Sequence, residues 1–363
     1  MKKYLKLTFL LLIISVLFTG CDSTQEQKDK NILLEKNSEE ENIQEFDEET
    51  KTIEDYFPFM ENTKLEYEGI GNEFAEQTTF FEFIENNRAQ LKIFNPGTVA
   101  VKILEYKDGE LREVFTEGEF YHIENMLDIR GESQNVILKE PLKAGNSWNI
   151  PGGHKRTISG IDVSIETPYK TFKALEVTTE FGDGKVQLDY YAKGVGLVAS
   201  IYKDGEFEVK TLLEDIEKEP YETEITFYYP LYSDIKVAYL ERDIKFNTND
   251  SIEKIIENNF KNPPSDKLLP VISDNTRVNS IKLNRGNKTV NIDFSEEFIS
   301  EMNAGSSLEG SILKSVVNTL GNYYGVEKVF ISIEGKPYSS GHFAIEENEY
   351  FTVDDSDLVE FKD

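Results

Sequence analysis

The sequence predicts a multidomain protein in which an antiparallel all-β domain is followed by an α+β two-layer sandwich with the order β-β-α-β-β-α-β. Three observations predict this fold class. Between residues 56 and 215, short apolar or alternating runs of strand length are separated by turn signals. After residue 220, apolar residues recur at helical spacing between further strands. The charged, proline-containing stretch 217–220 divides the two regions.

Composition narrows the function classes before any motif is considered. The 363 residues are 39% hydrophobic and 29% charged, which is typical of folded domains and argues against global disorder. Acidic residues outnumber basic ones by 68 to 39, giving a net charge of −29 that would repel nucleic-acid phosphates. A single Cys excludes an intrachain disulfide and a thiolate metal cluster. With histidines only at 122, 154 and 342, we expect no metal and no cofactor.

The amino-terminal residues have the pattern of a secretion signal. Lys2, Lys3 and Lys6 precede an apolar run over residues 7–18. A basic head followed by an apolar stretch of this length is typical of a signal peptide. The run is too short to span a bilayer, which takes about 20 apolar residues. The sequence therefore predicts a lipoprotein signal peptide over residues 1–20.

The run ends in Phe-Thr-Gly-Cys at residues 18–21, which resembles the lipobox of bacterial lipoproteins. Phe18 differs from the usual Leu of that motif. The resemblance implies cleavage before Cys21 and attachment of lipid to its thiol. We therefore expect a protein anchored to the cell membrane through Cys21, on the extracytoplasmic face.

Residues 21–54 are expected to form a disordered acidic tether. They are rich in Glu, Gln, Asn, Lys and Asp, and Phe46 is their only aromatic residue. Such a segment buries too little apolar surface to offset the entropy of ordering it. Its negative charge would push the folded part away from anionic headgroups.

Residues 55–216 are expected to form the antiparallel β domain. The tetrapeptide Lys-Asp-Gly-Glu occurs at 107–110 and again at 203–206, and Asp-Gly supplies the positive φ angles of tight hairpins. Both a sandwich and a partly closed barrel fit the pattern. Trp148 is interpreted as a core residue, with ligand stacking as the alternative, and Gly194 and Gly196 as a turn or bulge. An internal cavity that binds a lipid or a glycan remains an open alternative.

The third region, residues 220–353, is expected to hold two helices that each pack one face on a small sheet. Asp250 with Glu253, and Ser306 with Glu309, are interpreted as capping boxes that begin these helices. Apolar residues form one stripe of the second helix, at positions 308, 312, 313, 316, 317, 320 and 324. Expected strands lie at 224–229, 235–246, 277–283, 290–294 and 329–333.

The third region resembles the GerMN domain of sporulation and spore germination lipoproteins. The likeness is carried by segments within residues 220–336, at 225–229, 240–245, 289–295, 310, 316–320 and 329–335. The resemblance implies an extracytoplasmic, membrane-anchored protein of spore-forming bacteria with a binding or assembly role. Some relatives help to build ring-like complexes. This chain differs from the relatives that carry two tandem copies, because it has one copy preceded by a β domain. The family supplies no catalytic residues.

Three function classes follow. The first is an assembly or adaptor protein that contacts an envelope or sporulation protein through an exposed sheet edge or helix face. The second is a carrier or sensor that holds a lipid or wall fragment in a β-domain cavity. The third is a wall-acting hydrolase, but an enzyme is not expected, because the Gly-x-Ser-x-Gly, His-Glu-x-x-His and Walker motifs are absent. The acidic run 354–357 lacks the pattern of a calcium loop and is interpreted as a frayed tail.

Two polar residues in the second expected helix of this region have two interpretations. Asn318 and Thr319 lie mid-helix, where their intrinsic propensity is modest. In the first interpretation, the Asn318 side chain either faces solvent or caps a neighbouring loop. In the second, the pair makes a polar contact that holds a fixed loop or a partner subunit.

Overall fold

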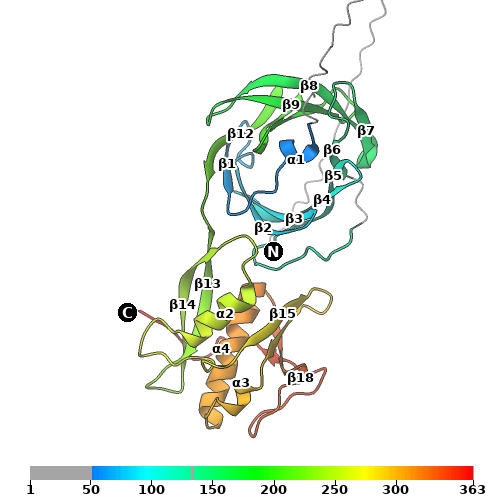
Figure 1. Cartoon of the computed structure of the whole chain (residues 1–363). Helices are drawn as coiled ribbons and strands as arrows, with labels where there is room; N and C mark the ends of the chain where they lie inside the picture. The colour runs from blue at the N-terminus through cyan, green and yellow to red at the C-terminus, as the bar shows by residue number, and fades with distance from the viewer. Residues whose placement is uncertain (1–50, 132–134, 363) are drawn as a thin grey trace, which may run out of the picture.

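The computed structural model describes residues 51–131 and 135–362. It is mostly antiparallel β structure, with a large, nearly closed sheet and a smaller carboxy-terminal unit that carries the long helix (Figure 1). The expected signal peptide, Cys21 and most of the expected tether lie outside the described residues. None of the described helices is long and apolar enough to cross a membrane.

The large sheet is an antiparallel meander of twelve strands. Its strands are β1 (Lys64–Ile70), β2 (Gln77–Glu85), β3 (Arg88–Asn95), β4 (Thr98–Lys107), β5 (Glu110–Gly118), β6 (Asn135–Lys139), β7 (Ser147–Ile150), β8 (His154–Glu166), β9 (Thr171–Glu180), β10 (Val186–Ala192), β11 (Gly196–Asp204) and β12 (Phe207–Glu217). Each strand pairs with its sequence neighbours except at β6 and β7, and β12 pairs with β1. The ring therefore has one break, which decides between the sandwich and the partly closed barrel in favour of the partly closed barrel.

Side chains, rather than a strand ladder, join the two sides of the break. Trp148 of β7 donates its indole N–H to the carbonyl oxygen of Val136 in β6 at 2.9 Å. Arg156 of β8 donates to the same oxygen at 2.6 Å. Trp148 is 7% exposed and packs in the apolar cluster inside this part of the ring. Its interpretation as a core residue is confirmed.

The middle of strand β2 is buried on both faces, which explains its nearly continuous apolar run. In β2, Phe80 and Phe83 belong to the cluster shared with the carboxy-terminal unit, whereas Phe81 belongs to the cluster inside the ring. All three are at most 5% exposed. A strand with one solvated face would instead alternate strictly between apolar and polar residues.

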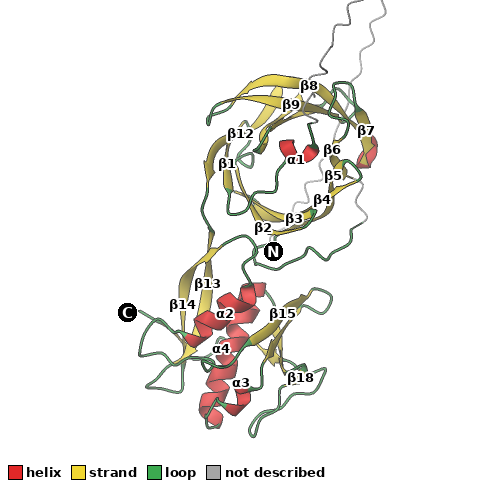
Figure 2. Cartoon of the chain, viewed as in Figure 1, coloured by secondary structure: helices red, strands yellow, loops and turns green. Residues whose placement is uncertain are grey.

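The carboxy-terminal unit contains two small sheets and three helices (Figure 2). One sheet has the order β13-β14-β20, and the other has the order β15-β16-β17-β18 with β19 beside β17. The elements are β13 (Tyr221–Pro230), β14 (Val237–Phe246), α2 (Ile252–Lys261), β15 (Val278–Asn284), β16 (Thr289–Phe294), α3 (Glu297–Ser300), α4 (Ser306–Tyr324), β17 (Lys328–Ile333), β18 (Lys336–Pro337), β19 (Phe351–Thr352) and β20 (Leu358–Glu360). The expectation of a single small sheet is therefore wrong.

Helix α4 lies between the two sheets and is buried on nearly all sides, so the expectation of a one-sided helix is also wrong. Small residues on the polar face of α4 allow the chain that follows β19 to approach the helix closely. Ser315, on this face, is fully buried. A Cβ atom on Gly321 would lie only 2.2 Å from a methyl group of Val353. The chain that follows β19 covers this face of the helix.

The carboxy-terminal residues are ordered against α4, which corrects the interpretation of 354–357 as a frayed tail. The Asn318 side chain donates to the carbonyl oxygen of Asp354 at 2.8 Å and accepts from its N–H at 3.0 Å. Lys314 forms an ion pair with the Asp354 carboxylate at 2.9 Å. Beyond these contacts, β20 pairs in parallel with β14. Asn318 is fully buried and holds a fixed loop, so the solvent-facing alternative is wrong.

Both expected capping boxes differ in the structure. Helix α2 is capped by Ser251, whose hydroxyl accepts from the N–H of Lys254, while Asp250 caps the preceding turn by accepting from Asn247. The residue before α4 is Gly305, which makes no side-chain cap. Glu309 is engaged elsewhere, as described below.

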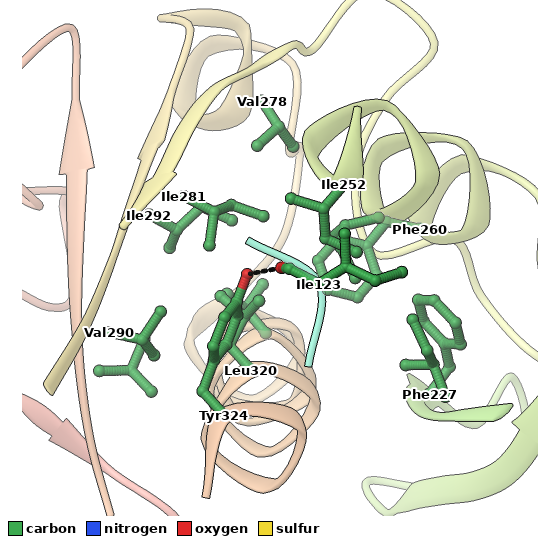
Figure 3. Packing of buried hydrophobic residues seen from close by; sticks show 14 of the residues in the cluster. Ile123, Phe227, Ile252, Phe260, Val278, Ile281, Val290, Ile292, Leu320 and Tyr324 are labelled. Atoms are coloured by element: carbon green, nitrogen blue, oxygen red, sulfur yellow. Dashed lines mark hydrogen bonds between the residues drawn. The ribbon is translucent and has the colours of Figure 1, made fainter. Parts of the chain in front are cut away.

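The segment after β5 docks into the carboxy-terminal unit and joins the two parts of the chain. Figure 3 shows Ile123 lying among Phe260, Leu320 and Tyr324. Its N–H donates to the Tyr323 hydroxyl at 2.8 Å, and its carbonyl oxygen accepts from Tyr324 at 3.5 Å. The apolar core is therefore continuous between the large sheet and the carboxy-terminal unit.

Candidate functional site

A cavity of about 290 Å³ lies inside the nearly closed sheet. Its walls come from strands on both sides of the ring, and Phe57, Pro58 and Met60 line it from the segment that precedes β1. This volume is close to the lower end of the range for small-molecule pockets, about 300 Å³. The cavity is therefore the leading candidate for a ligand site.

The segment that reaches into the ring begins with the short helix α1 (Ile53–Tyr56), drawn inside the sheet in Figure 1. Thr52 and Asp55 form a capping box at its start. The N–H of Gly194 donates to the Asp55 carbonyl oxygen at 2.7 Å. The tether was expected to extend to residue 54, and this boundary is wrong because α1 begins at Ile53. Ile53 and Tyr56 are buried and supply the apolar surface that the rest of the segment lacks.

The turn at Gly194 contacts helix α1 through the hydrogen bond to Asp55. Gly194 has φ 76° and Gly196 has φ 101°, which are conformations that L side chains rarely adopt. The register shifts between Tyr190 and Tyr191 where β10 pairs with β11. The interpretation as a turn with a bulge is confirmed.

One wall of the cavity carries a buried carboxylate. Asp189 of β10 is 5% exposed. Its Oδ1 accepts from Gln187 Nε2 at 2.8 Å and from the Ser200 hydroxyl at 2.7 Å. Burial raises the pKa of Asp189, while the hydrogen bonds from Gln187 and Ser200 act in the opposite direction. The sequence analysis missed this residue, because an Asp between Leu188 and Tyr190 reads as the solvent-facing position of an ordinary strand.

The cations of the cavity are already engaged. Lys102 forms an ion pair with Glu113 at 2.8 Å. The Arg156 guanidinium donates to Asn135 Oδ1 at 2.9 Å and to the Thr179 hydroxyl at 3.1 Å, in addition to the Val136 carbonyl oxygen. Within residues 51–131 and 135–362, no lysine or arginine forms an ion pair with Asp189.

A second polar cluster lies between the large sheet and the carboxy-terminal unit. Lys92 and Glu82 are both fully buried and form an ion pair at 2.9 Å. Gln90 donates to the other carboxylate oxygen of Glu82 at 2.8 Å. Lys92 also donates to the carbonyl oxygen of His122 at 2.8 Å, which fixes the segment that carries Ile123. This cluster is structural, since its described polar groups are paired with one another.

The three histidines contact different groups. His122 Nε2 lies 3.2 Å from Glu124, and the ring of His154 lies against Phe181. His342 Nδ1 lies 2.6 Å from Glu309 Oε2. Within the described residues, no group of three His, Cys, Asp or Glu side chains is placed to hold a metal ion.

Glu309 is a buried carboxylate of the carboxy-terminal unit with three side-chain partners. It is 3% exposed. It accepts from the Tyr338 hydroxyl at 2.7 Å, from the Ser340 hydroxyl, and from His342 as above. Burial would raise the pKa of Glu309, but the hydrogen bonds from Ser340, His342 and Tyr338 together hold it below the usual value. Glu309 therefore fixes the loop after β18 to α4, and the expected capping role is wrong.

This arrangement predicts a pH-dependent contribution to stability. A carboxyl group with a lowered pKa stabilises the fold above the ordinary glutamate value of 4.5 and loses that contribution as the pH falls through its folded pKa. Glu309→Gln is expected to lower the free energy of unfolding by about 1–3 kcal/mol at pH 7. The difference from the wild type should shrink as the pH falls below 4.5. Urea unfolding at a series of pH values measures it.

The exposed hairpin variant Glu206→Gln serves as the control and should show no pH-dependent difference. A Glu309→Gln difference that stays constant down to the acid transition would contradict the assigned pKa direction.

The fold and the cavity define a mostly antiparallel β protein with a ligand-sized internal space and a small helix-containing unit. Residues 226–339 of that unit match the family model Germane, described as sporulation and spore germination. The chain therefore contains a Germane domain, and the resemblance to GerMN-containing sporulation and germination proteins is confirmed.

Several solved structures are similar to this chain, among them two that contain GerMN domains. One, of the tandem GerMN domains of the sporulation protein GerM from Bacillus subtilis, is 18% identical with a TM-score of 0.26 and covers 35% of this chain. This chain spans 46% of the length of that structure. The other, of the first GerMN domain of the same protein, is 21% identical with a TM-score of 0.24, and the match covers 38% of this chain and 99% of that one. No curated protein matches the chain.

Proposed function

We propose that this protein is a lipid-anchored, extracytoplasmic binding and assembly protein with no catalytic activity, which acts in sporulation or spore germination. The match of residues 226–339 to the Germane family is the observation that carries the proposal. The proposed anchor is Cys21, at the end of the lipobox-like segment. The acidic residues that follow would hold the folded part away from the membrane surface.

In this proposal the chain has two domains, an antiparallel β domain over residues 55–216 and an α+β domain that begins at residue 220. The continuous core around Ile123 supports a rigid arrangement of the two. Because α4 is buried, contact with an envelope protein would use other surfaces. Tyr232 and Ile235, in the connection between β13 and β14, are 75% and 72% exposed and are available for such a contact.

Anchoring has a direct test. Cys21→Ser removes the only thiol of the chain, and with it the atom to which the lipid would be attached. We expect the wild-type protein to sediment with membranes and the variant to be released into the soluble extracytoplasmic fraction. Fractionation followed by immunoblotting measures the shift. A variant that stays on the membrane as completely as the wild type would contradict anchoring through Cys21.

The assembly role has a separate test in sporulating cells. Expression is expected to rise during sporulation, and crosslinking is expected to capture an envelope protein. A gene that is silent throughout sporulation and germination would contradict the proposed role, even if the anchor were correct.

A second candidate function is that of a carrier or sensor. The cavity of about 290 Å³ inside the nearly closed sheet favours it. Its lining mixes apolar side chains with Asp189, Arg156 and Lys102, which suits a small amphipathic ligand better than a fully apolar one.

A further inference from the structure

We propose that the cavity inside the large sheet binds a small ligand with an apolar body and an ammonium group, and that Asp189 is the counter-ion of that group. The inference rests on the carrier or sensor candidate and is independent of anchoring through Cys21. It deepens that candidate by naming the ligand class and the residue that selects it.

The position of Asp189 is fixed by its neighbours. It lies directly opposite Ser200 in the pairing of β10 with β11, and Gln187 precedes it by two residues on the same face. Both donate to its Oδ1. Both hydrogen bonds that the described residues donate to Asp189 end on Oδ1, and the side chain lines the cavity. One oxygen is thus held in place, and in this proposal the other receives the ligand.

Asp189 also forms no ion pair with any described lysine or arginine; Arg156 and Lys102 act to lower its pKa, but from beyond ion-pair distance. A buried carboxylate is costly unless it is paired with a cation. Lys102 is paired with Glu113, and Arg156 is directed at Asn135, Val136 and Thr179. An ammonium group that entered the cavity would supply a cation in direct contact and donate to Oδ2.

The rest of the cavity indicates the body of the ligand. Phe57, Met60 and Leu104 contribute apolar walls, and the volume of about 290 Å³ limits the occupant to a small molecule. The net charge of −29 attracts cations to the protein and repels anions from it. Both features favour a compact apolar amine over an anionic lipid.

Three ligands of nearly equal size test this inference: 4-phenylbutylamine, 4-phenylbutan-1-ol and 4-phenylbutanoate. They share one apolar body and differ in the charge of the head group. Isothermal titration calorimetry at pH 7 would use the processed chain, residues 21–363, with Cys21→Ser to prevent lipid attachment. We expect the amine to bind with one-to-one stoichiometry, at least tenfold more tightly than the alcohol or the acid.

Asp189→Asn is the informative variant, because it removes the charge and retains an acceptor for Gln187 and Ser200. It should reduce amine affinity at least tenfold and leave alcohol affinity unchanged. Asp162→Asn is the matched control, since Asp162 is a largely exposed Asp outside the cavity lining. Its amine affinity should equal that of the wild type.

Each other result overturns the proposal. Tighter binding of the acid would mean that Lys102 and Arg156 select the ligand, and binding of none of the three would mean that the cavity admits no such molecule. Unchanged amine affinity in Asp189→Asn would show that Asp189 is not the counter-ion of the ligand. If that variant fails to fold by circular dichroism, Ile93→Phe decides, because it adds bulk to the cavity wall and should abolish amine binding. Retained binding in Ile93→Phe would exclude the cavity as the site.

Discussion

Lys92→Met is expected to lower the free energy of unfolding by about 3–5 kcal/mol, because it leaves a buried carboxylate without its cation. Lys92 and Glu82 are both fully buried, and their ion pair is 2.9 Å long. The ammonium group of Lys92 also lies 5.3 Å from the centre of the Phe120 ring. Met retains most of the apolar length of the side chain, so the loss would come from the charge and its hydrogen bonds. Urea unfolding measures it.

The same substitution should loosen the junction between the two parts of the chain. Lys92 donates to the carbonyl oxygen of His122, and the next residue, Ile123, inserts into the carboxy-terminal unit. Hydrogen exchange is therefore expected to increase over residues 119–131 in the variant. Since the core is continuous across the junction, the wild type should unfold in a single transition. The variant should begin to show two separate unfolding transitions.

A matched surface pair provides the control. Lys210 and Glu208 form an ion pair at 2.7 Å with side chains 35% and 33% exposed. Lys210→Met should cost less than about 1 kcal/mol, as is usual for exposed pairs. The double variant Lys92→Met with Glu82→Leu should recover part of the lost stability, because no buried charge remains. Equal losses for Lys92→Met and Lys210→Met would contradict the assigned role of the buried pair.

Local patterns in the sequence predicted the elements well. The repeated Lys-Asp-Gly-Glu tetrapeptides mark the hairpins between β4 and β5 and between β11 and β12. The apolar residues of α4 fall on the expected positions, and β16 and β17 coincide with the expected strands to within a residue or two. These features depend on interactions between residues close in sequence, which periodicity and turn chemistry report directly.

What the sequence did not predict depends on contacts between distant segments. Lys92 reads as the solvent-facing residue of a strand, because nothing near it in the sequence shows that residues 119–131 will cover that face. Glu309 reads as a cap, because its donors Tyr338, Ser340 and His342 are about 30 residues away. Asp189 reads as an exposed position until the sheet closes around it. Closure of the sheet and the docking of covering segments therefore determine the candidate site.

Trp148→Ala is expected to destabilise the protein by about 3–5 kcal/mol and to open the break in the large sheet. The indole fills the space between β6 and β7, the two strands of the ring that do not pair with each other. It belongs to the same buried apolar cluster as Leu138, Leu142 and Ile158, and its bond to the Val136 carbonyl oxygen links the two strands. The substitution by Ala would both leave a cavity and remove the hydrogen bond from the indole N–H. Urea unfolding would report the stability, and hydrogen exchange should rise in β6 and β7.

Trp148→Phe separates the two contributions, because the ring volume is largely retained and only the indole N–H is lost. Its expected cost is about 1 kcal/mol, the usual net value of one hydrogen bond. Arg156 still donates to the Val136 carbonyl oxygen in this variant, so the two sides of the break should stay joined. If Trp148→Ala left hydrogen exchange in β6 and β7 unchanged, Arg156 and its bonds to Asn135 and Val136 would be sufficient to hold the ring closed, and the indole would act only as core volume.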